Sequence, residues 1–153
     1  MIKKFLPLCI FILFLNNCGY APIYSKKDQN FQINKIETFG EMKVNKVLLN
    51  RLKIYKNNPN AKNTFDLIIT SKSTKTTTTK DKKGNPTQFS INLAVNIKIL
   101  EDLNNDVEVV FSESNTFDNS NNKFDLRKYE DNLIKNMTEK IFSEIILFIQ
   151  TKN

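Results

Sequence analysis

The sequence predicts an α+β fold in which a four-stranded, mostly antiparallel sheet carries two helices on one of its faces, in the order β-α-β-β-β-α. The first observation behind this prediction is a switch in hydrophobic period, which is helical over 41–56 and 126–148 but close to two residues in between. The second is that three strand patterns follow one another without a helix, which is typical of an antiparallel meander. Both helices are then free to cover the same face, and residues 31–150 form one domain.

The first strand is predicted over 31–39 from β-prone residues at irregular spacing, and Gly40 ends it. A helix follows over 41–56, with Glu41 in its first turn, where the helix dipole favours an acidic side chain. Its apolar residues share one face: Val44, Val47, Leu48, Leu52 and Tyr55. The basic residues lie mostly elsewhere, so we interpret the opposite side as a solvated face, with contact to anionic lipid as the alternative.

The second strand is predicted to start at Thr64 and to project past the core. Its first residues alternate between apolar and polar as far as Ile69, but the following segment, 71–80, contains only threonine, serine and lysine. Threonine favours strands, yet this composition offers no apolar face for burial. The cluster 81–86 predicts a turn, so the Thr/Lys segment becomes one arm of an exposed hairpin.

The third strand has the clearest alternation in the chain. Odd-numbered residues over 89–99 are apolar and those between them are mostly polar, which predicts one buried and one wetter face. Leu93 should therefore lie in the core and Asn92 on the open side. After a turn at 102–106, a fourth strand is predicted over 107–117.

The C-terminal helix is predicted to begin with Asp125 as its N-cap, and Phe124 should pack against Tyr129 as a hydrophobic staple. Apolar residues keep helical spacing from there to Phe148. A membrane helix is the alternative, because the segment 145–149 is entirely apolar. Charged residues interrupt the run before it: Lys135, Glu139, Lys140 and Glu144. Packing across the sheet is therefore the expected arrangement.

The N-terminus carries the pattern of a lipoprotein signal peptide. A short basic start is followed by an apolar run over 5–15 and by Cys18, with leucine three residues before the cysteine. The cysteine thiol is then joined to diacylglycerol, residues 1–17 are removed, and residues 18–30 tether the domain to the membrane. Gly19, where aspartate would retain the protein in the inner membrane, predicts the outer membrane. Spanning a bilayer takes roughly 20 apolar residues, which disfavours a plain anchor; an ordinary cleaved signal is the other alternative.

Composition restricts the function. The chain has a net charge of +7, which favours anionic partners. It contains no histidine and only three glycines, so the commonest general base and metal ligand and any glycine-rich phosphate loop are missing. We expect neither an enzyme nor a metal or cofactor site. Cys9 leaves with the signal peptide and Cys18 is alkylated, so no disulfide is expected. An export signal disfavours a nucleic-acid binder.

Short motifs at both ends of the mature chain carry a resemblance to a known family. Residues 18–24 read Cys-Gly-Tyr-Ala-Pro-Ile-Tyr, and later segments read Phe-Asp-Asn at 117–119, Phe-Asp at 124–125 and Glu-Asp-Asn at 130–132. The first resembles the opening of the lipopolysaccharide-assembly lipoprotein family, LptE, in its α-proteobacterial form. The others are similar to that family's segment between its last strand and last helix. The predicted order of elements is also similar over nearly all of the mature chain.

This resemblance implies a non-enzymatic subunit of the lipopolysaccharide translocon. Members of the family sit in the lumen of the LptD β-barrel, plug it, assist its assembly, and bind lipopolysaccharide through basic residues. We expect such residues in the Thr/Lys hairpin: Lys72, Lys75, Lys80, Lys82 and Lys83. A solvated hairpin tip is the alternative for each lysine. The alternative function is a lipoprotein adaptor of another outer-membrane complex, either a barrel-insertion accessory or a secretin pilotin.

Overall fold

The computed structural model describes residues 30–100 and 106–152. These residues form one sheet and two helices, with a short 3₁₀ turn after the first helix. In chain order the elements are β1 (Phe31–Gly40), α2 (Met42–Leu52), η3 (Lys53–Tyr55), β2 (Asn63–Lys80), β3 (Pro86–Leu100), β4 (Val107–Asp118) and α3 (Lys123–Thr151). The signal peptide, Cys18, nearly all of the tether and most of the predicted turn at 102–106 lie outside the described residues.

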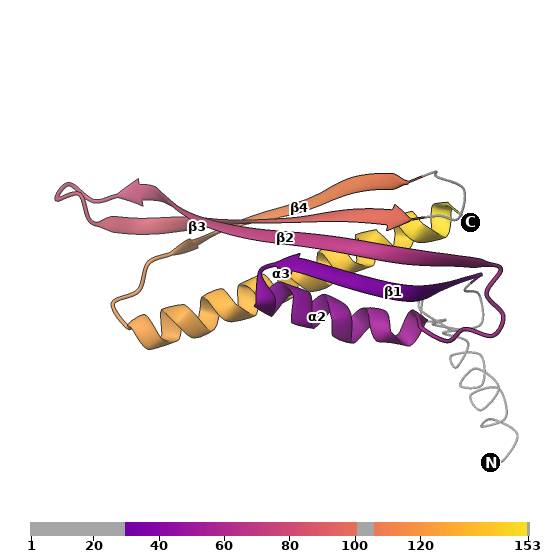
Figure 1. Ribbon diagram of the computed structural model, residues 1–153. Coiled ribbons are helices and arrows are strands. Elements are labelled where there is room, and N and C mark those ends of the chain that lie inside the picture. The colour runs from indigo at the N-terminus through magenta and orange to yellow at the C-terminus, as the bar shows by residue number, and fades with distance from the viewer. Residues whose placement is uncertain (1–29, 101–105, 153) are drawn as a thin grey trace, which may run out of the picture.

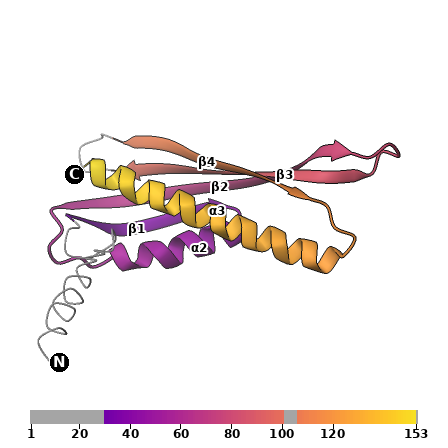
Figure 2. The same ribbon diagram turned by 180° about the vertical axis from the view of Figure 1, so that it is seen from behind.

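The strands lie side by side in the order β1-β2-β3-β4. β1 pairs with β2 in parallel, whereas the β2–β3 and β3–β4 pairs are antiparallel. A parallel pair requires a crossover connection, and α2 lies within it. Figures 1 and 2 show α2 and α3 on the same face of the sheet, with α2 beside β1 and α3 running across the longer strands. The predicted α+β architecture is therefore confirmed.

The core lies between the sheet and the two helices. In β3 every odd-numbered residue from Ile91 to Ile99 is buried, as the alternation predicts. The helices contribute buried residues at helical spacing: Val44, Leu48 and Leu52 from α2, and Leu133, Met137, Ile141, Ile145 and Ile149 from α3. Phe31 of β1 and Tyr55 of η3 stack with their ring centroids 5.3 Å apart. Removal of this apolar surface from water is the main force that holds the helices to the sheet.

A buried polar network joins the end of β1 to the start of α2. Ser71 Oγ donates a hydrogen bond to Asn45 Oδ1 at 2.7 Å, and Asn45 Nδ2 donates to the Phe39 carbonyl oxygen at 3.0 Å. Burying these polar groups is tolerable because they satisfy one another. Gly40 lies against this network with a φ of 90°. A Cβ atom at Gly40 would meet the Ser71 carbonyl oxygen at 1.9 Å, so the position requires glycine.

Replacing Gly40 with alanine is expected to lower the free energy of unfolding by about 1–3 kcal/mol, because the backbone is strained and the new methyl group collides with Ser71. Gly84→Ala is the matched control. Gly84 has a similar φ of 85°, but a Cβ added there has no neighbouring heavy atom within 4 Å. Urea denaturation of both variants measures the difference. If the two variants lose the same free energy of unfolding, the contact between the new methyl group and Ser71 adds no cost, and this explanation for Gly40 is wrong.

Both helix starts differ from the prediction. Glu41 is the N-cap residue of α2, outside its first turn, and its side chain makes no capping hydrogen bond. The N-cap of α3 is Asn122, whose side-chain oxygen accepts hydrogen bonds from the backbone N–H groups of Phe124 at 3.1 Å and Asp125 at 3.3 Å. Asparagine caps a helix as well as aspartate does. The earlier cap places Asp125 in the first turn, where its charge interacts favourably with the helix dipole.

The predicted staple between Phe124 and Tyr129 is wrong. With the cap at Asn122, Phe124 lies inside the helix instead of before it, and its side chain is 74% exposed. Tyr129 packs instead against Phe117 of β4, with ring centroids 5.7 Å apart. The first helix is also shorter than predicted, because α2 ends at Leu52 and tightens into η3.

α3 packs along the sheet, as expected from the charges that interrupt its apolar face. Its buried residues fall on the side that faces β3 and β4, and Lys140 on its exposed side pairs with Glu113 of β4 at 2.6 Å. Over 30–100 and 106–152, no helix combines the length and the apolar content needed to cross a membrane.

Candidate functional site

The β2–β3 hairpin extends beyond the helices as a projecting arm (Figures 1 and 2). β1 pairs with β2 only as far as Ser71, and β4 pairs with β3 only as far as Gln88. From Lys72 onward, the outer edge of β2 therefore has no neighbouring strand in the described part of the chain. Beyond Gln88 the arm consists of two strands and a turn, and we call residues 79–87 the hairpin tip.

The Thr/Lys composition explains why this arm does not contribute to the core. Every residue from Thr74 to Asn85 is exposed. Threonine maintains the strand, and lysines along an unpaired edge discourage another chain from adding to it. Register shifts occur on both sides of Thr79, and such irregularities increase the local twist of a strand. The arm is thus a stable extension that leaves its side chains available to solvent or to a partner.

The turn at the tip is held by Asp81. Its carboxylate accepts hydrogen bonds from the backbone N–H groups of Lys83 and Asn85, each at 2.8 Å, and from the Asn85 side chain at 2.9 Å. These bonds, chiefly that from the Asn85 side chain, lower the pKa of Asp81. Because the carboxylate remains ionised and hydrogen-bonded to the turn, Lys82 and Lys83 are presented on an ordered scaffold.

The structure separates the predicted lysines into three groups. Lys80, Lys82 and Lys83 come together at the tip, where all three are exposed. Lys72 lies opposite Ala94, on the face of the sheet that carries no helix. Lys75 lies on the other face, opposite Ile91.

Lys75 is held by neighbouring residues at the base of the arm. Its ammonium group forms an ion pair with Glu130 of α3. The same group lies 4.1 Å from the ring centroid of Phe89 and 5.4 Å from that of Phe117, which gives favourable cation–π geometry. Lys75 therefore attaches the arm to α3, and we separate it from the lysines that are available to a ligand.

Other basic residues on the helical side are also paired. Lys43 of α2 contacts Asp131 of α3 at 2.6 Å, and the Arg51 guanidinium donates three hydrogen bonds to the Glu139 carboxylate. These pairs join the two helices and neutralise part of the basic face of α2. By contrast, Lys72 and the three tip lysines form no ion pair with any described residue. Of the lysines predicted to bind a ligand, those without an ion pair are therefore concentrated at the hairpin tip.

The second exposed surface is the face of the sheet opposite the helices, which we call the open face. Its residues are mostly short and polar: Thr70, Lys72 and Thr74 from β2, Asn92, Ala94 and Asn96 from β3, and Val110, Ser112 and Ser114 from β4. Asn96 donates a hydrogen bond to Glu108 across the β3–β4 pair. Such a surface can form hydrogen bonds with a partner that presents polar groups.

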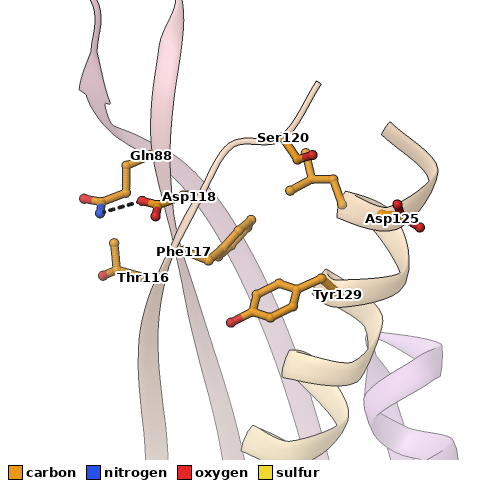
Figure 3. Close-up of a pocket in the computed structure, with 8 residues that line it drawn as sticks. Gln88, Thr116, Phe117, Asp118, Ser120, Asp125 and Tyr129 are labelled. Carbon is orange, nitrogen blue, oxygen red and sulfur yellow. Dashed lines mark hydrogen bonds between the residues drawn. The ribbon is translucent and has the colours of Figure 1, made fainter. Parts of the chain in front are cut away.

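A cleft between the end of β4 and the start of α3 was not predicted (Figure 3). It is lined by Gln88, Thr116, Phe117, Asp118, Ser120, Asp125, Leu126 and Tyr129. The sequence analysis identified parts of it only as the motifs at 117–119 and 124–125. Its residues come from three elements and a loop, so no local pattern could have revealed it. Within the described ranges, the cleft included, no group of three acidic residues or cysteines is placed to bind a metal ion.

The fold places the chain among small α+β domains known from solved lipoproteins. It is similar to the crystal structure of rare lipoprotein B from Shewanella oneidensis, with a TM-score of 0.61 and 11% identity over 78% of this chain and 96% of that chain. The solution NMR structure of an uncharacterized lipoprotein B from Nitrosomonas europaea gives 0.54 and 15% over 76% and 81%.

A minor lipoprotein from Acinetobacter baumannii, known from a crystal structure, also has this fold, with a TM-score of 0.54 and 13% identity over 76% of this chain and 92% of that chain. At such low identities the similarity shows a shared fold. No protein-family model and no curated protein sequence matches this chain.

Proposed function

We propose that this protein is an outer-membrane lipoprotein subunit of the lipopolysaccharide transport and assembly machinery. It plugs an LptD-like β-barrel, assists its assembly and binds lipopolysaccharide, without an enzymatic step. Acyl chains on Cys18 anchor it to the membrane. The observation that carries the proposal is the projecting arm, which ends in three unpaired lysines on an ordered turn and adds nothing to the core.

The open face supports the role of a plug. The lumen of a large outer-membrane barrel is polar and wet, so a protein inside it must present hydroxyl, amide and charged groups. The open face offers these groups over an area formed by three strands, because both helices lie on the other side. The shared fold with solved lipoproteins is consistent with this location.

The tip supports an interaction with lipopolysaccharide. The ligand carries phosphates and sugar acids, and a lysine ammonium group binds such anions as a compact charge with three donors. Lys80, Lys82 and Lys83 are exposed and unpaired among the described residues, so little must be broken before they bind. The arm also holds them away from the acidic residues that pair with the helical lysines.

Replacing Lys80, Lys82 and Lys83 together with glutamine is expected to weaken lipopolysaccharide capture by about tenfold, because three exposed charge contacts are lost. The urea midpoint should change little, since the three side chains are fully outside the core. Capture by the wild type should fall with added salt. Binding of purified protein to immobilised lipopolysaccharide measures both effects.

The matched control is the triple variant Arg127→Gln, Lys128→Gln and Lys135→Gln, which removes the same charge from exposed positions of α3. It should bind lipopolysaccharide as the wild type does. If both triple variants lose capture equally, net charge and not the tip determines binding. If neither loses capture, the lipopolysaccharide site lies elsewhere, and the tip has no part in it.

A further inference from the structure

The segment formed by α2, η3 and the loop after them is strongly basic. Every charged residue from 42 to 65 is a lysine or an arginine. Lys43 and Arg51 of this segment are paired with α3. Three others near its C-terminal end are exposed and form no ion pair with any described residue: Lys53, Lys56 and Lys62. Positive charge therefore remains unneutralised at this end of the segment.

These three lysines lie around the point where the tether joins the domain. The Lys62 backbone N–H donates a hydrogen bond to the Asn30 carbonyl oxygen at 2.7 Å. The other two lie on either side of Tyr55 in the chain, and the ring of Tyr55 stacks on Phe31. We call residues 53–62 the anchor end. Figures 1 and 2 show the end of α2 next to the start of β1, on the side of the molecule opposite the hairpin tip.

The described acidic residues that the sheet places at the same end are already engaged. Asp66 of β2 accepts hydrogen bonds from the Asn34 side chain at 2.9 Å and from the Lys35 backbone N–H at 3.1 Å. Asp106, just before β4, forms an ion pair with Lys98 at 2.7 Å. Neither carboxylate pairs with a lysine of the anchor end. The lysines there are therefore available to an anionic partner from outside the chain.

The tether determines which anionic partner is nearby. A chain of the length of residues 18–29 spans at most about 40 Å, so a domain anchored at Cys18 stays close to the bilayer. Each lysine near an anionic leaflet raises the affinity by about fivefold, which is weak for a free protein. The tether keeps the local concentration of headgroups high, so contacts of this strength are populated.

We propose that the anchor end rests on the anionic phospholipid headgroups of the leaflet that holds the acyl chains. Lys53, Lys56 and Lys62 bind the phosphate groups. Ile54, which is 46% exposed in the same turn, enters the headgroup layer. The hairpin tip then points away from the bilayer. This inference rests on the lipid anchor of the proposed function and adds the orientation of the domain, but it requires neither a β-barrel nor lipopolysaccharide.

The test joins the whole mature chain, residues 18–153, to a maleimide-bearing lipid through the Cys18 thiol, so the result does not depend on acylation in the cell. The chain contains no tryptophan, and Ile54→Trp therefore introduces a single fluorescent reporter. The vesicles contain brominated phosphatidylcholine as the quencher, with or without phosphatidylglycerol. Phosphatidylglycerol should increase the quenching at position 54 by at least about threefold, and added salt should reverse this increase.

Phe124→Trp is the control reporter, because Phe124 is 74% exposed at the start of α3, away from the anchor end (Figure 1). Its quenching should not depend on phosphatidylglycerol. Asn60→Trp, at an exposed position of the loop, is a second anchor-end reporter if Ile54→Trp does not fold. If phosphatidylglycerol increases quenching at neither anchor-end position, or increases it equally at position 124, the proposal is overturned.

Two charge variants locate the contact. Replacing Lys53, Lys56 and Lys62 together with glutamine should remove the increase in quenching, whereas the glutamine variant of the three tip lysines should retain it. The opposite result would place the tip on the bilayer and contradict the proposed orientation.

A comparison of salts separates a bilayer contact from a site for free phosphate. Sodium phosphate and sodium chloride at equal ionic strength should reduce the quenching equally, and a larger effect of phosphate would identify a phosphate site instead. The intact mass of the protein from cells tests acylation of Cys18 separately. Failure of the lipid anchor is thus distinguished from failure of the anchor-end contact.

Discussion

Leu93→Ala is expected to reduce the free energy of unfolding by about 2–5 kcal/mol, the cost of a cavity in a well-packed core. Leu93 lies in the middle of β3, between β2 and β4, and its side chain is fully buried beneath the helices. β3 itself is hydrogen-bonded to a strand on each side at this position, so its backbone has little freedom to collapse into the space. A loss of this size is a large part of the roughly 5–15 kcal/mol that stabilises a typical domain.

Asn92→Ala is the matched control for this prediction. Asn92 is the next residue in the same strand, but its side chain lies on the open face and is exposed. Its replacement should change stability by about 0.5 kcal/mol or less. Urea denaturation gives both changes in the free energy of unfolding, provided that this free energy falls with urea concentration at the same slope in each protein. Equal losses at the two positions would show that both faces of the sheet are buried, and the open face would then be unavailable to a partner.

Cys18→Ala is expected to release the protein from the membrane. On the lipoprotein interpretation, the acyl chains on Cys18 provide the anchor, and each buried methylene group contributes about 0.8 kcal/mol to membrane binding. Fractionation of cells that lack the proposed partner barrel measures the effect, because binding to that barrel would hold the variant at the membrane without acyl chains. Intact-mass measurement of the wild type should show the added acyl groups on Cys18.

The control for this experiment is Cys9→Ala, which changes the other cysteine of the chain within the segment predicted to be removed. The mature protein from that variant should be identical to the wild type and equally membrane-bound. If Cys18→Ala matures at the same site and remains bound to the membrane as firmly as the wild type, the protein is not a lipoprotein.

Local patterns predicted the elements of the fold well. The alternation in β3 identified its buried and open faces, and the Thr/Lys segment identified the projecting arm. The irregular spacing in the first strand has a structural cause, because the pairing of β1 with β2 shifts register between Ile33 and Ile36. The parallel direction of that pair was not predicted, since strand pairing depends on contacts between distant residues.

The candidate sites were predicted less completely. The density of lysines in the sequence indicated the hairpin as a candidate site. Which of these lysines are free to bind a ligand depends on the register of β2, and this register turns Lys75 toward Phe89 and Glu130. The irregular pairing near Thr79 prevents simple counting from the turn. The cleft depends on Tyr129 meeting Phe117, and this contact replaced the predicted staple once α3 began at Asn122.

The most direct test of the proposed function is an affinity purification of the tagged protein from detergent-solubilised outer membrane, with mass spectrometry of proteins and lipids in the same sample. We expect an LptD-like β-barrel and lipopolysaccharide to co-purify with the wild type, and less lipopolysaccharide with the variant that lacks Lys80, Lys82 and Lys83. Recovery of a secretin or a barrel-insertion complex, without lipopolysaccharide, would contradict the proposal and identify the protein as an adaptor of that complex.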